Sequence, residues 1–363
     1  MLGPLGPPEQ QASTKYSVTR PNPATSPAVN RYFVWPPGAH DAAEFQPQVY
    51  LSTGRLSDMY YFCRILQALD RALPGAGVTF LVTWNVDRFD DRFEDAIVLL
   101  IGDERCQTPS YVDRVRAVFK TGGIRRNPIA WTLMLPWSIA WRVMLRDLRN
   151  VCIAARRGTT GSRPSLYAIP LGTYHLVEVP YVPFEARSID VFFAGTVPKL
   201  SRFDLRPSVA ARLQLVDGMR AAEAALPDWR FEHRLTRTDG TLYDADEYSW
   251  KTANSKIVPC PRGNFEETFR LFEAAKCGCV IVTEPLPRRW YYRDAPVIEI
   301  RRWSQLPAAL DLLRRHPERI LELAEKTKRW WDECLCETAV ARYMIDNLGL
   351  SSRGNQHLGA QVA

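Results

Sequence analysis

The segment between Lys256 and Glu284 combines residue types that suit phosphate binding. A tight turn, Pro261-Arg262-Gly263, is followed by acids and a second arginine at helical spacing. A helix that begins behind such a turn presents free N–H groups and about half a positive charge to a ligand. An arginine in the turn adds a fork of donors that matches a phosphate. The segment therefore predicts a site for the phosphates of a nucleotide.

The turn must be positioned by the elements on either side of it. The apolar run Ile257 to Cys260 predicts a buried strand, and Cys279 to Thr283 predicts a second one. Between them we expect a helix, roughly Phe265 to Lys276, with Asn264 as its cap and Glu267 at the third position of a capping box. A strand, a helix and a second strand in this order require a parallel sheet with a right-handed crossover.

The helix would place one carboxylate at a useful distance from the turn. Glu266, Arg270 and Glu273 share one helix face by their spacing. Glu273 would lie about 10 Å along the axis from the helix start. That is about the reach from a diphosphate to its own ribose, whose hydroxyls a carboxylate can accept. The alternative is a solvent-exposed face with a Glu266–Arg270 pair worth a few tenths of a kcal/mol, and the spacing alone leaves both open.

The segment PCPRGNFEETFRLFEAAKCGCVIV resembles the donor-binding segment of exostosin-like glycosyltransferases and, more loosely, of GT-B retaining transferases. The matching positions are Pro261, Arg262, Gly263, Thr268, Arg270, Glu273, Ala274 and Gly278. A second match, Asp190 to Thr196, resembles the strand and loop that open the nucleotide domain of the same group, and the resemblance covers roughly residues 189–348. It implies a nucleotide diphosphate sugar as co-substrate, with donor-binding residues Gly195, Thr196, Lys199, Arg262, Gly263, Asn264, Thr268, Arg270 and Glu273.

The chain departs from the wider group at one position. Many GT-B transferases carry two glutamates eight residues apart, but Phe265 stands eight residues before Glu273. The role of the earlier glutamate is therefore not implied here. Asp244-Ala-Asp246 has the spacing with which another transferase class holds a metal, but it lies in a polar loop. We expect it to be a chance match, and we expect no metal and no resident cofactor.

Length and element pattern predict two α/β domains. The 363 residues are enough for two cores. We expect a GT-B-like fold of two Rossmann-like, doubly wound domains facing a cleft. The first would span residues 31–182 and bind the acceptor, and the second would span residues 186–348 and bind the nucleotide sugar. The tails, residues 1–30 and 351–363, are polar and are expected to be disordered.

The first domain offers a candidate catalytic base. Ligands bind at the carboxyl ends of strands in such sheets, which places Ser52-Thr53-Gly54 and Gly102-Asp103-Glu104 on the ligand side. Asp103 and Glu104 follow the aliphatic strand Ala96 to Ile101. Either acid could serve as a base, although an acid at this place is as often a turn or helix cap.

Local patterns predict further elements. Helices are expected at residues 57–73, 111–120, 207–226, 303–314, 317–331 and 337–348, and strands at residues 49–52, 78–84, 166–171, 177–182, 191–194, 229–235 and 297–300. The apolar stretch Pro128 to Leu145 is interrupted by Pro136 and contains Arg142, so it does not predict a membrane span. We expect it to be buried, the alternative being a surface that contacts lipid or an apolar acceptor.

Composition excludes some functions and leaves others open. Apolar residues make up 46% of the chain, charged residues 24%, and the net charge is +7. The arginine pairs at 288/289, 301/302 and 314/315 are expected to be solvent-exposed, although they would also suit an anionic partner or a membrane surface. Aromatic residues are not interleaved with them, which argues against a nucleic-acid binder. Eight cysteines without zinc-like spacing, and no secretory signal, favour buried reduced thiols and a cytoplasmic protein, with membrane association left open.

These observations together predict a metal-independent glycosyltransferase. Negative charge on the departing phosphate would be met by fixed donors, and an inverting enzyme would need a base for the acceptor hydroxyl. The alternatives are a nucleotide-sugar epimerase on the same fold and a non-catalytic nucleotide-sugar-binding protein. The acceptor could be a glycan, a lipid or a protein. The sequence does not indicate the sugar, the nucleobase, the stereochemical outcome or the oligomeric state.

Overall fold

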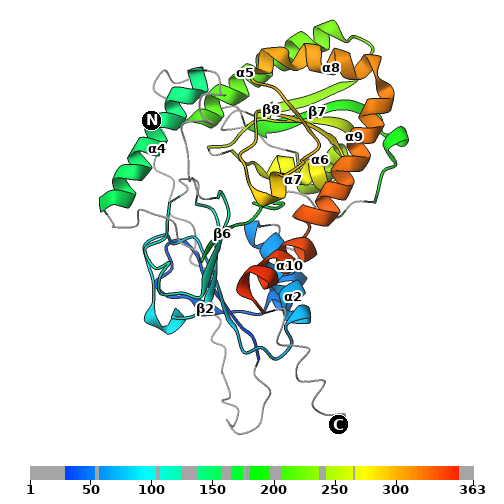
Figure 1. The fold of residues 1–363 in the computed structure, drawn as a ribbon. Coiled ribbons are helices and arrows are strands. Elements are labelled where there is room, and N and C mark those ends of the chain that lie inside the picture. Colours follow the sequence, from blue (N-terminus) through cyan, green and yellow to red (C-terminus); the bar gives the residue numbers. More distant parts are fainter. Residues whose placement is uncertain are drawn as a thin grey trace, which may run out of the picture.

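Two separate parallel sheets organise the chain (Figure 1). The computed structural model describes residues 29–53, 57–103, 107–123, 137–156, 165–174, 178, 180–196, 206–236, 243–264 and 266–350. The first sheet has the order β2-β1-β3-β4-β5-β6, in which only the edge pair β1 and β2 is antiparallel. Its strands are β1 (Arg31–Trp35), β2 (Ala43–Glu44), β3 (Thr79–Thr83), β4 (Ile97–Leu100), β5 (Ala117–Lys120) and β6 (Leu166–Ala168).

The second sheet has the order β11-β10-β9-β7-β8, and every neighbouring pair in it is parallel. Its strands are β7 (Ile189–Thr196), β8 (Phe231–Thr236), β9 (Ser255–Cys260), β10 (Val280–Thr283) and β11 (Val297–Glu299). Strands β4 and β10 consist of four consecutive buried residues each. Such continuous aliphatic runs are typical of parallel strands that are covered on both faces.

Helices and short turns connect these strands. They are α1 (Pro47–Ser52), α2 (Asp58–Ala72), η1 (Asp91–Phe93), α4 (Trp137–Arg156), η2 (Phe184–Ala186), α5 (Pro207–Ala225), α6 (Ala245–Ala253), α7 (Phe269–Lys276), η3 (Trp290–Tyr292), η4 (Trp303–Gln305), α8 (Leu306–Arg315), α9 (Pro317–Trp330), the π-helical turn η5 (Trp331–Leu335) and α10 (Glu337–Leu348). Ser57 is the N-cap of α2, because its hydroxyl oxygen accepts a hydrogen bond from the Met59 N–H. Helix α10 ends at Gly349, which has the left-handed conformation that glycine adopts readily.

The last helix returns to the first sheet. Helix α10 packs against α2, as Figure 1 shows for the red and blue helices. The Tyr61 hydroxyl in α2 donates a 2.5 Å hydrogen bond to the Leu335 carbonyl, in the π-helical turn just before α10. One apolar core contains Phe62 and Leu66 of α2 together with Phe272 of α7 and Val340 of α10. Two parallel-sheet α/β halves joined in this way form the GT-B-like fold that the sequence predicts.

Several local predictions are wrong. Residues 49–52 lie in helix α1, which begins with a proline at its first position. The predicted helix at 111–120 is absent, because residues 111–116 form turns and bends and residues 117–120 form strand β5. Strand β5 includes Lys120, a charged residue that is completely buried. The strand was not predicted because a charged residue in an apolar run normally indicates a solvent-exposed position. No strand is present among the described residues of 177–182.

The apolar stretch at 128–145 is only partly buried in its described part. Residues 128–136 lie outside the described residues, and from Trp137 onward the chain forms α4. One side of α4, including Ile139 and Val143, is buried against α5, but Met144 and Leu145 are exposed. Within the described part of the chain, no helix is long and apolar enough to cross a membrane.

Candidate functional site between the two sheets

The carboxyl ends of the two sheets contact each other. The Arg289 guanidinium, beyond β10, donates a 2.8 Å hydrogen bond to the Gly122 carbonyl, beyond β5. The Trp290 indole donates to the Ala168 carbonyl at the end of β6, at 2.7 Å. The Tyr174 N–H, beyond β6, donates to the Glu273 carboxylate of α7 at 3.1 Å. Because ligands of parallel α/β sheets bind at the carboxyl ends of strands, we take this contact region as the candidate site.

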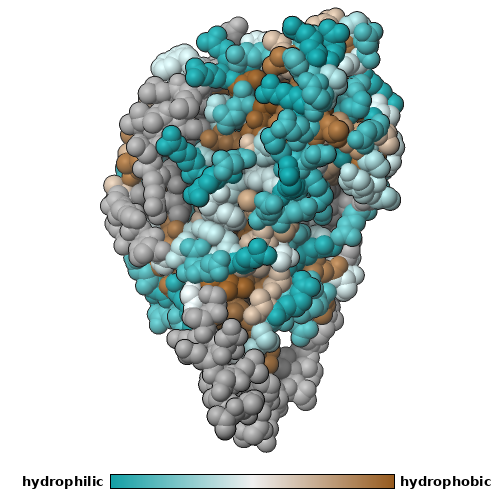
Figure 2. All heavy atoms as spheres, turned by 45° about the vertical axis from the view of Figure 1, so that its right-hand side comes forward, coloured by the Kyte–Doolittle hydropathy of each residue, from teal (hydrophilic) through white to brown (hydrophobic). Residues whose placement is uncertain are grey.

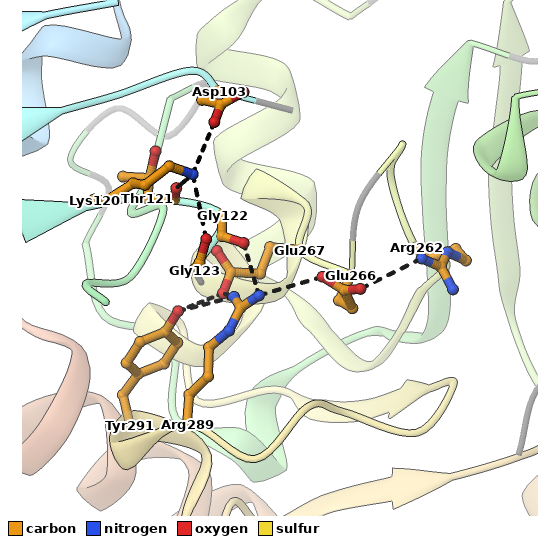
Figure 3. A network of polar contacts seen from close by, with 10 residues as sticks. All are labelled: Asp103, Lys120, Thr121, Gly122, Gly123, Arg262, Glu266, Glu267, Arg289 and Tyr291. Atoms are coloured by element: carbon orange, nitrogen blue, oxygen red, sulfur yellow. Dashed lines mark hydrogen bonds and ion pairs between the residues drawn. The ribbon is translucent and has the colours of Figure 1, made fainter. Parts of the chain in front are cut away.

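Arg289 is the centre of a buried ionic network (Figure 3). Its Nη1 pairs with Glu267 Oε1, and its Nη2 lies 3.2 Å from Glu266 Oε2. The Tyr291 hydroxyl also donates to Glu267, at 2.5 Å. The side chains of Arg289, Glu266 and Glu267 are 7%, 2% and 0% exposed. The prediction that the Arg288/Arg289 pair is solvent-exposed is therefore wrong for Arg289.

The first domain accommodates this arginine through a glycine. Gly123 has a φ of +69°, and a Cβ at this position would lie 2.5 Å from the Arg289 guanidinium carbon. A side chain here would both strain the backbone and displace the arginine. The Gly122-Gly123 turn is thus shaped to receive Arg289 from the other half of the molecule.

Burial raises the pKa of two acids at the carboxyl end of the second sheet. Burial raises the pKa of Glu267 above its usual range, and the nearby Arg289 charge opposes that rise. Burial also raises the pKa of Glu284, with Arg262 acting in the opposite direction. The Glu284 carboxylate accepts from the Arg262 backbone N–H at 2.9 Å and from the Trp303 indole at 2.8 Å.

The helix behind the Pro261-Arg262-Gly263 turn begins later than predicted. Helix α7 starts at Phe269, with Thr268 as an N-cap that makes no side-chain capping bond. The predicted capping box is wrong, because Asn264 accepts from the Ser208 hydroxyl at 2.7 Å and Glu267 pairs with Arg289. Those tertiary contacts hold the segment before Thr268 out of a helix, and Glu266 is not on the α7 face.

Glu273 consequently lies only about 6 Å along the axis from the first helical residue, instead of about 10 Å. It is completely buried. One carboxylate oxygen accepts from the Tyr174 N–H, and the other accepts from the Tyr248 hydroxyl at 2.7 Å. In this structure the carboxylate joins the two halves of the molecule, and contact with a ribose, which stays a prediction, would require these two bonds to open.

Arg270 lies across the end of strand β7. Its Nη2 donates to the Ala194 carbonyl, and its guanidinium stands over the Phe193 ring at 4.5 Å. Its Nε is buried and makes no hydrogen bond to the described residues. Gly195 leaves room for this arrangement, because a Cβ there would lie 2.9 Å from Arg270 Nη2. The predicted residues Gly195 and Arg270 are thus in direct proximity.

The Gly195–Arg270 proximity leads to a testable prediction. Replacing Gly195 with alanine should push the arginine away from the Ala194 carbonyl while costing under about 1 kcal/mol of stability, since the end of a long side chain moves easily. If Arg270 binds phosphate, the affinity for a nucleotide diphosphate should fall about tenfold, the loss of a charge-assisted bond. Calorimetric titration and urea unfolding of the same variant measure the two effects. Unchanged affinity with normal folding would contradict a role for Arg270.

Arg262 is buried beside the network. Its side chain is 2% exposed, and its Nη2 lies 3.8 Å from Glu266 Oε1. Arg262 and Gly263 stand at the carboxyl end of β9, and Thr196 ends β7. Lys199 and Glu104 lie outside the described residues, as does the side chain of Thr196, so their predicted roles stay predictions.

Asp103 lines a cavity at the carboxyl end of the first sheet. The cavity has a volume of about 480 Å³, and its lining residues are Trp84, Asn85, Val86, Asp87, Arg88, Gly102, Asp103 and Gln107. The Asp103 carboxylate lies 2.9 Å from the Lys120 ammonium and accepts from the Gln107 N–H at 2.6 Å. Lys120 Nζ also donates to the Gly123 carbonyl at 3.2 Å, next to the turn that receives Arg289 (Figure 3).

The Asp244-Ala-Asp246 motif has a structural role. The Asp244 side chain accepts from the Glu247 N–H and caps α6. No group of acids, histidines and cysteines in the described part of the chain could hold a metal ion.

The cysteines that the structure describes are free thiols, of which Cys63, Cys260 and Cys279 are buried and Cys152 is exposed. Exposure of Cys152 departs from the expected burial, because it lies on the open side of α4.

Sequence reasoning missed Glu266, Glu267, Arg289 and Lys120 as members of one network. The available signal was weak: a lysine within an apolar run, and two adjacent acids after a glycine turn. Nothing in local spacing indicates that Arg289 meets the other members, because its partners Glu267, Glu266 and Gly122 lie 22, 23 and 167 residues away.

No family model and no curated protein matches the sequence. Solved structures do resemble the fold. One is the GtfA/B complex, with a TM-score of 0.43 and 10% identity over 86% of this chain, which spans 62% of the matched chain. Another is the sucrose-phosphate synthase of Thermosynechococcus elongatus, with a TM-score of 0.42 and 13% identity over 82% of this chain and 94% of that one. A third is described as a putative UDP-N-acetylglucosamine 2-epimerase from Listeria monocytogenes, with a TM-score of 0.39 and 10% identity over 78% of this chain and 91% of that one. At these TM-scores the likenesses carry no weight for function.

Proposed function

We propose that the protein is a glycosyltransferase that moves a sugar from a nucleotide diphosphate donor to an acceptor hydroxyl. The observation that carries the proposal is the meeting of the two sheets at their carboxyl ends. Arg270 and the glycine turn lie at the ends of β7 and β9 on one side. A cavity lined by Asp103 lies at the ends of β3 and β4 on the other. Cations near the departing phosphate and a carboxylate near the acceptor would suit transfer of a phosphate-linked sugar.

The chemistry follows from the charges that develop during transfer. Breaking the anomeric bond leaves negative charge on the departing phosphate, and fixed donors can stabilise it. We assign this role to Arg270, whose buried Nε makes no hydrogen bond to the described residues, with Gly263 allowing close approach of the backbone. We also assign donor contacts to Arg262, Asn264 and Thr268, and beyond the described part to Lys199.

We further propose that the transfer needs no metal and that the protein is exostosin-like in its donor segment. The arginines would supply the positive charge that a metal supplies in other transferases, and Asp244 is used as a helix cap. Asp103 is the proposed base for the acceptor, and its cavity is large enough for a sugar-sized acceptor. The acceptor class, a glycan, lipid or protein, is left to experiment.

Replacing Arg270 with methionine tests the proposed donor site. We expect the wild-type protein to be stabilised by at least one nucleoside diphosphate or nucleotide sugar from a panel with uridine, guanosine and adenosine bases, because a ligand that binds only the native state raises the Tm. The methionine variant should bind that ligand at least about tenfold more weakly, as expected for a lost charge-assisted bond.

The matched control is Arg315→Met. Arg315 lies at the end of α8, and its side chain is 65% exposed, so its loss should leave the affinity unchanged and lower the stability by no more than about 1 kcal/mol. The same titrations and melting curves apply to both variants. If no nucleotide of the panel shifts the Tm of the wild-type protein, or if Arg270→Met binds as well as Arg315→Met, the donor site is not where we propose it.

A further inference from the structure

Helix α4 has an exposed apolar face beside the face that packs against α5. Ile139, Ala140 and Val143 are buried against Ala211 of α5. Five other large apolar residues of the same helix are exposed: Trp137 (76%), Met144 (48%), Leu145 (50%), Leu148 (62%) and Val151 (55%). We call these five residues the α4 stripe. Figure 1 shows α4 at the outer edge of the molecule, away from both sheets.

The α4 stripe is not ordinary surface scatter. Half of the large exposed apolar side chains among the described residues lie on this one helix. Its members 137, 144, 148 and 151 are spaced by seven, four and three residues, so they lie along one side of the helix. Figure 2 turns the side of the molecule that carries α9 toward the reader, and this side is mostly hydrophilic with scattered hydrophobic areas. Contiguous apolar surface of this kind marks an interaction site.

Positive charge accompanies the stripe. Arg142, Arg149 and Arg156 are spaced by seven residues, so they form a row along the helix beside the stripe. Arg149 and Arg156 are exposed, and Arg142 is partly exposed with its guanidinium 4.6 Å from the Trp141 ring centre. The helix has one acid, Asp147, and its side chain is buried. The open side of α4 therefore presents apolar residues and cations together.

We propose that α4 binds the surface of an anionic lipid membrane. An amphipathic helix with tryptophan and leucine on one face and arginines beside it is suited to lie in the plane of the lipid headgroups. The stripe would enter the boundary between headgroups and acyl chains, and the arginine row would meet lipid phosphates. The tryptophan suits this boundary because its ring is apolar and its N–H is polar. The inference stands on α4 alone and is independent of the nucleotide site.

A second copy of the chain fits the same face less well. A two-fold contact places the same patch of both copies against itself, and it would crowd the Arg142, Arg149 and Arg156 rows of two molecules into a small area. An anionic lipid surface instead supplies the opposite charge to the exposed Arg149 and Arg156. Charge complementarity thus selects lipid over self-association.

Sedimentation of the full chain with lipid vesicles tests the proposal. The vesicles are phosphatidylcholine alone and phosphatidylcholine with 30% phosphatidylglycerol, at low and high salt. We expect binding to the anionic vesicles and weakening by salt. Arg149→Glu should reduce the partition coefficient about fivefold or more, since each cation near such a surface contributes about 1 kcal/mol. Trp137→Ser with Leu148→Gln should reduce it at least about tenfold.

The control is Trp250→Ser with Leu312→Gln. Trp250 and Leu312 are 49% and 43% exposed but lie on α6 and α8, so this variant should bind vesicles like the wild-type protein. Circular dichroism checks that both double variants fold. Absence of binding to anionic vesicles, or equal binding by the two double variants, would overturn the proposal. So would a wild-type dimer that Leu148→Gln converts to a monomer, because the stripe would then be a subunit interface.

Discussion

Replacing Arg289 with methionine is expected to lower the free energy of unfolding by about 3–5 kcal/mol, the usual effect of removing one partner from a buried ion pair. The substitution would leave Glu266 and Glu267, which are 2% and 0% exposed, without their shared cation. It would also remove the hydrogen bond to the Gly122 carbonyl that joins the two halves of the molecule. Urea unfolding of the two proteins measures the difference.

The pH dependence of that loss has a definite sign. Burial raises the pKa of Glu267 even beside Arg289, and without the arginine this pKa should rise further. A carboxyl group whose folded pKa lies above its unfolded value contributes stability below the unfolded pKa and loses it as the pH rises through the folded pKa. The variant should therefore lose less stability near pH 5, where Glu267 can hold a proton, than near pH 8. A loss that grows toward acid would contradict this account.

Arg315→Met is the matched control for Arg289→Met. Both substitutions remove an arginine that pairs with carboxylates, but the Arg315 side chain is 65% exposed and pairs with Asp311 on its own helix. Exposed pairs of this kind contribute about 0–1 kcal/mol. If the two variants lose similar stability, the buried network does not hold the molecule together.

The parts of the fold that depend on local patterns were predictable. Strands β4 and β10 are short buried runs of mainly aliphatic residues, and β9 contains the predicted apolar run Ile257 to Cys260. Helices α2, α5 and α10 lie within one or two residues of their predicted bounds. Each of these elements is stabilised by the same apolar spacing that makes it visible in the sequence.

The parts that depend on tertiary contacts were not predictable. A capping box at Asn264 and Glu267 is the better local solution, but Ser208 and Arg289 bind these side chains and delay the start of α7. Lys120 fits in a buried strand only because Asp103 and the Gly123 carbonyl surround its ammonium group. Local spacing carries no information about Ser208, Arg289 and Asp103, which are distant in the sequence from the residues they contact.

The candidate site was predicted in part for the same reason. Gly195 and Arg270 were chosen from a resemblance, and the structure places a Cβ at Gly195 within 2.9 Å of Arg270 Nη2. The distance argument for Glu273, however, assumed a helix that began at Phe265. The observed start at Phe269 shortens it, and the carboxylate accepts from Tyr174 and Tyr248. Ribose binding by this acid stays a prediction, and it requires these two hydrogen bonds to open.

Asp103→Asn should reduce the rate of sugar transfer by about 10²–10⁴-fold if Asp103 is the base that activates the acceptor. An amide cannot take the proton of the acceptor hydroxyl, whereas its shape is nearly that of the carboxylate. Donor affinity should not change, because Asp103 lies at the end of β4, on the first sheet. Single-turnover transfer from the donor found by the binding panel measures the rate.

Two variants separate catalysis by Asp103 from its structural pairing with Lys120. Both side chains are nearly inaccessible, at 4% and 0% exposed, so Asp103→Asn and Lys120→Met should each lower the stability by leaving a buried charge unpaired. Only Asp103→Asn removes the carboxylate, so Lys120→Met should keep most of the transfer rate at a temperature where both variants are folded. Asp87→Asn removes another carboxylate from the same cavity and should also leave the rate within about tenfold of the wild type. Equal losses in the Asp103 and Lys120 variants would mean that the ion pair is structural, and the base would then have to be sought elsewhere.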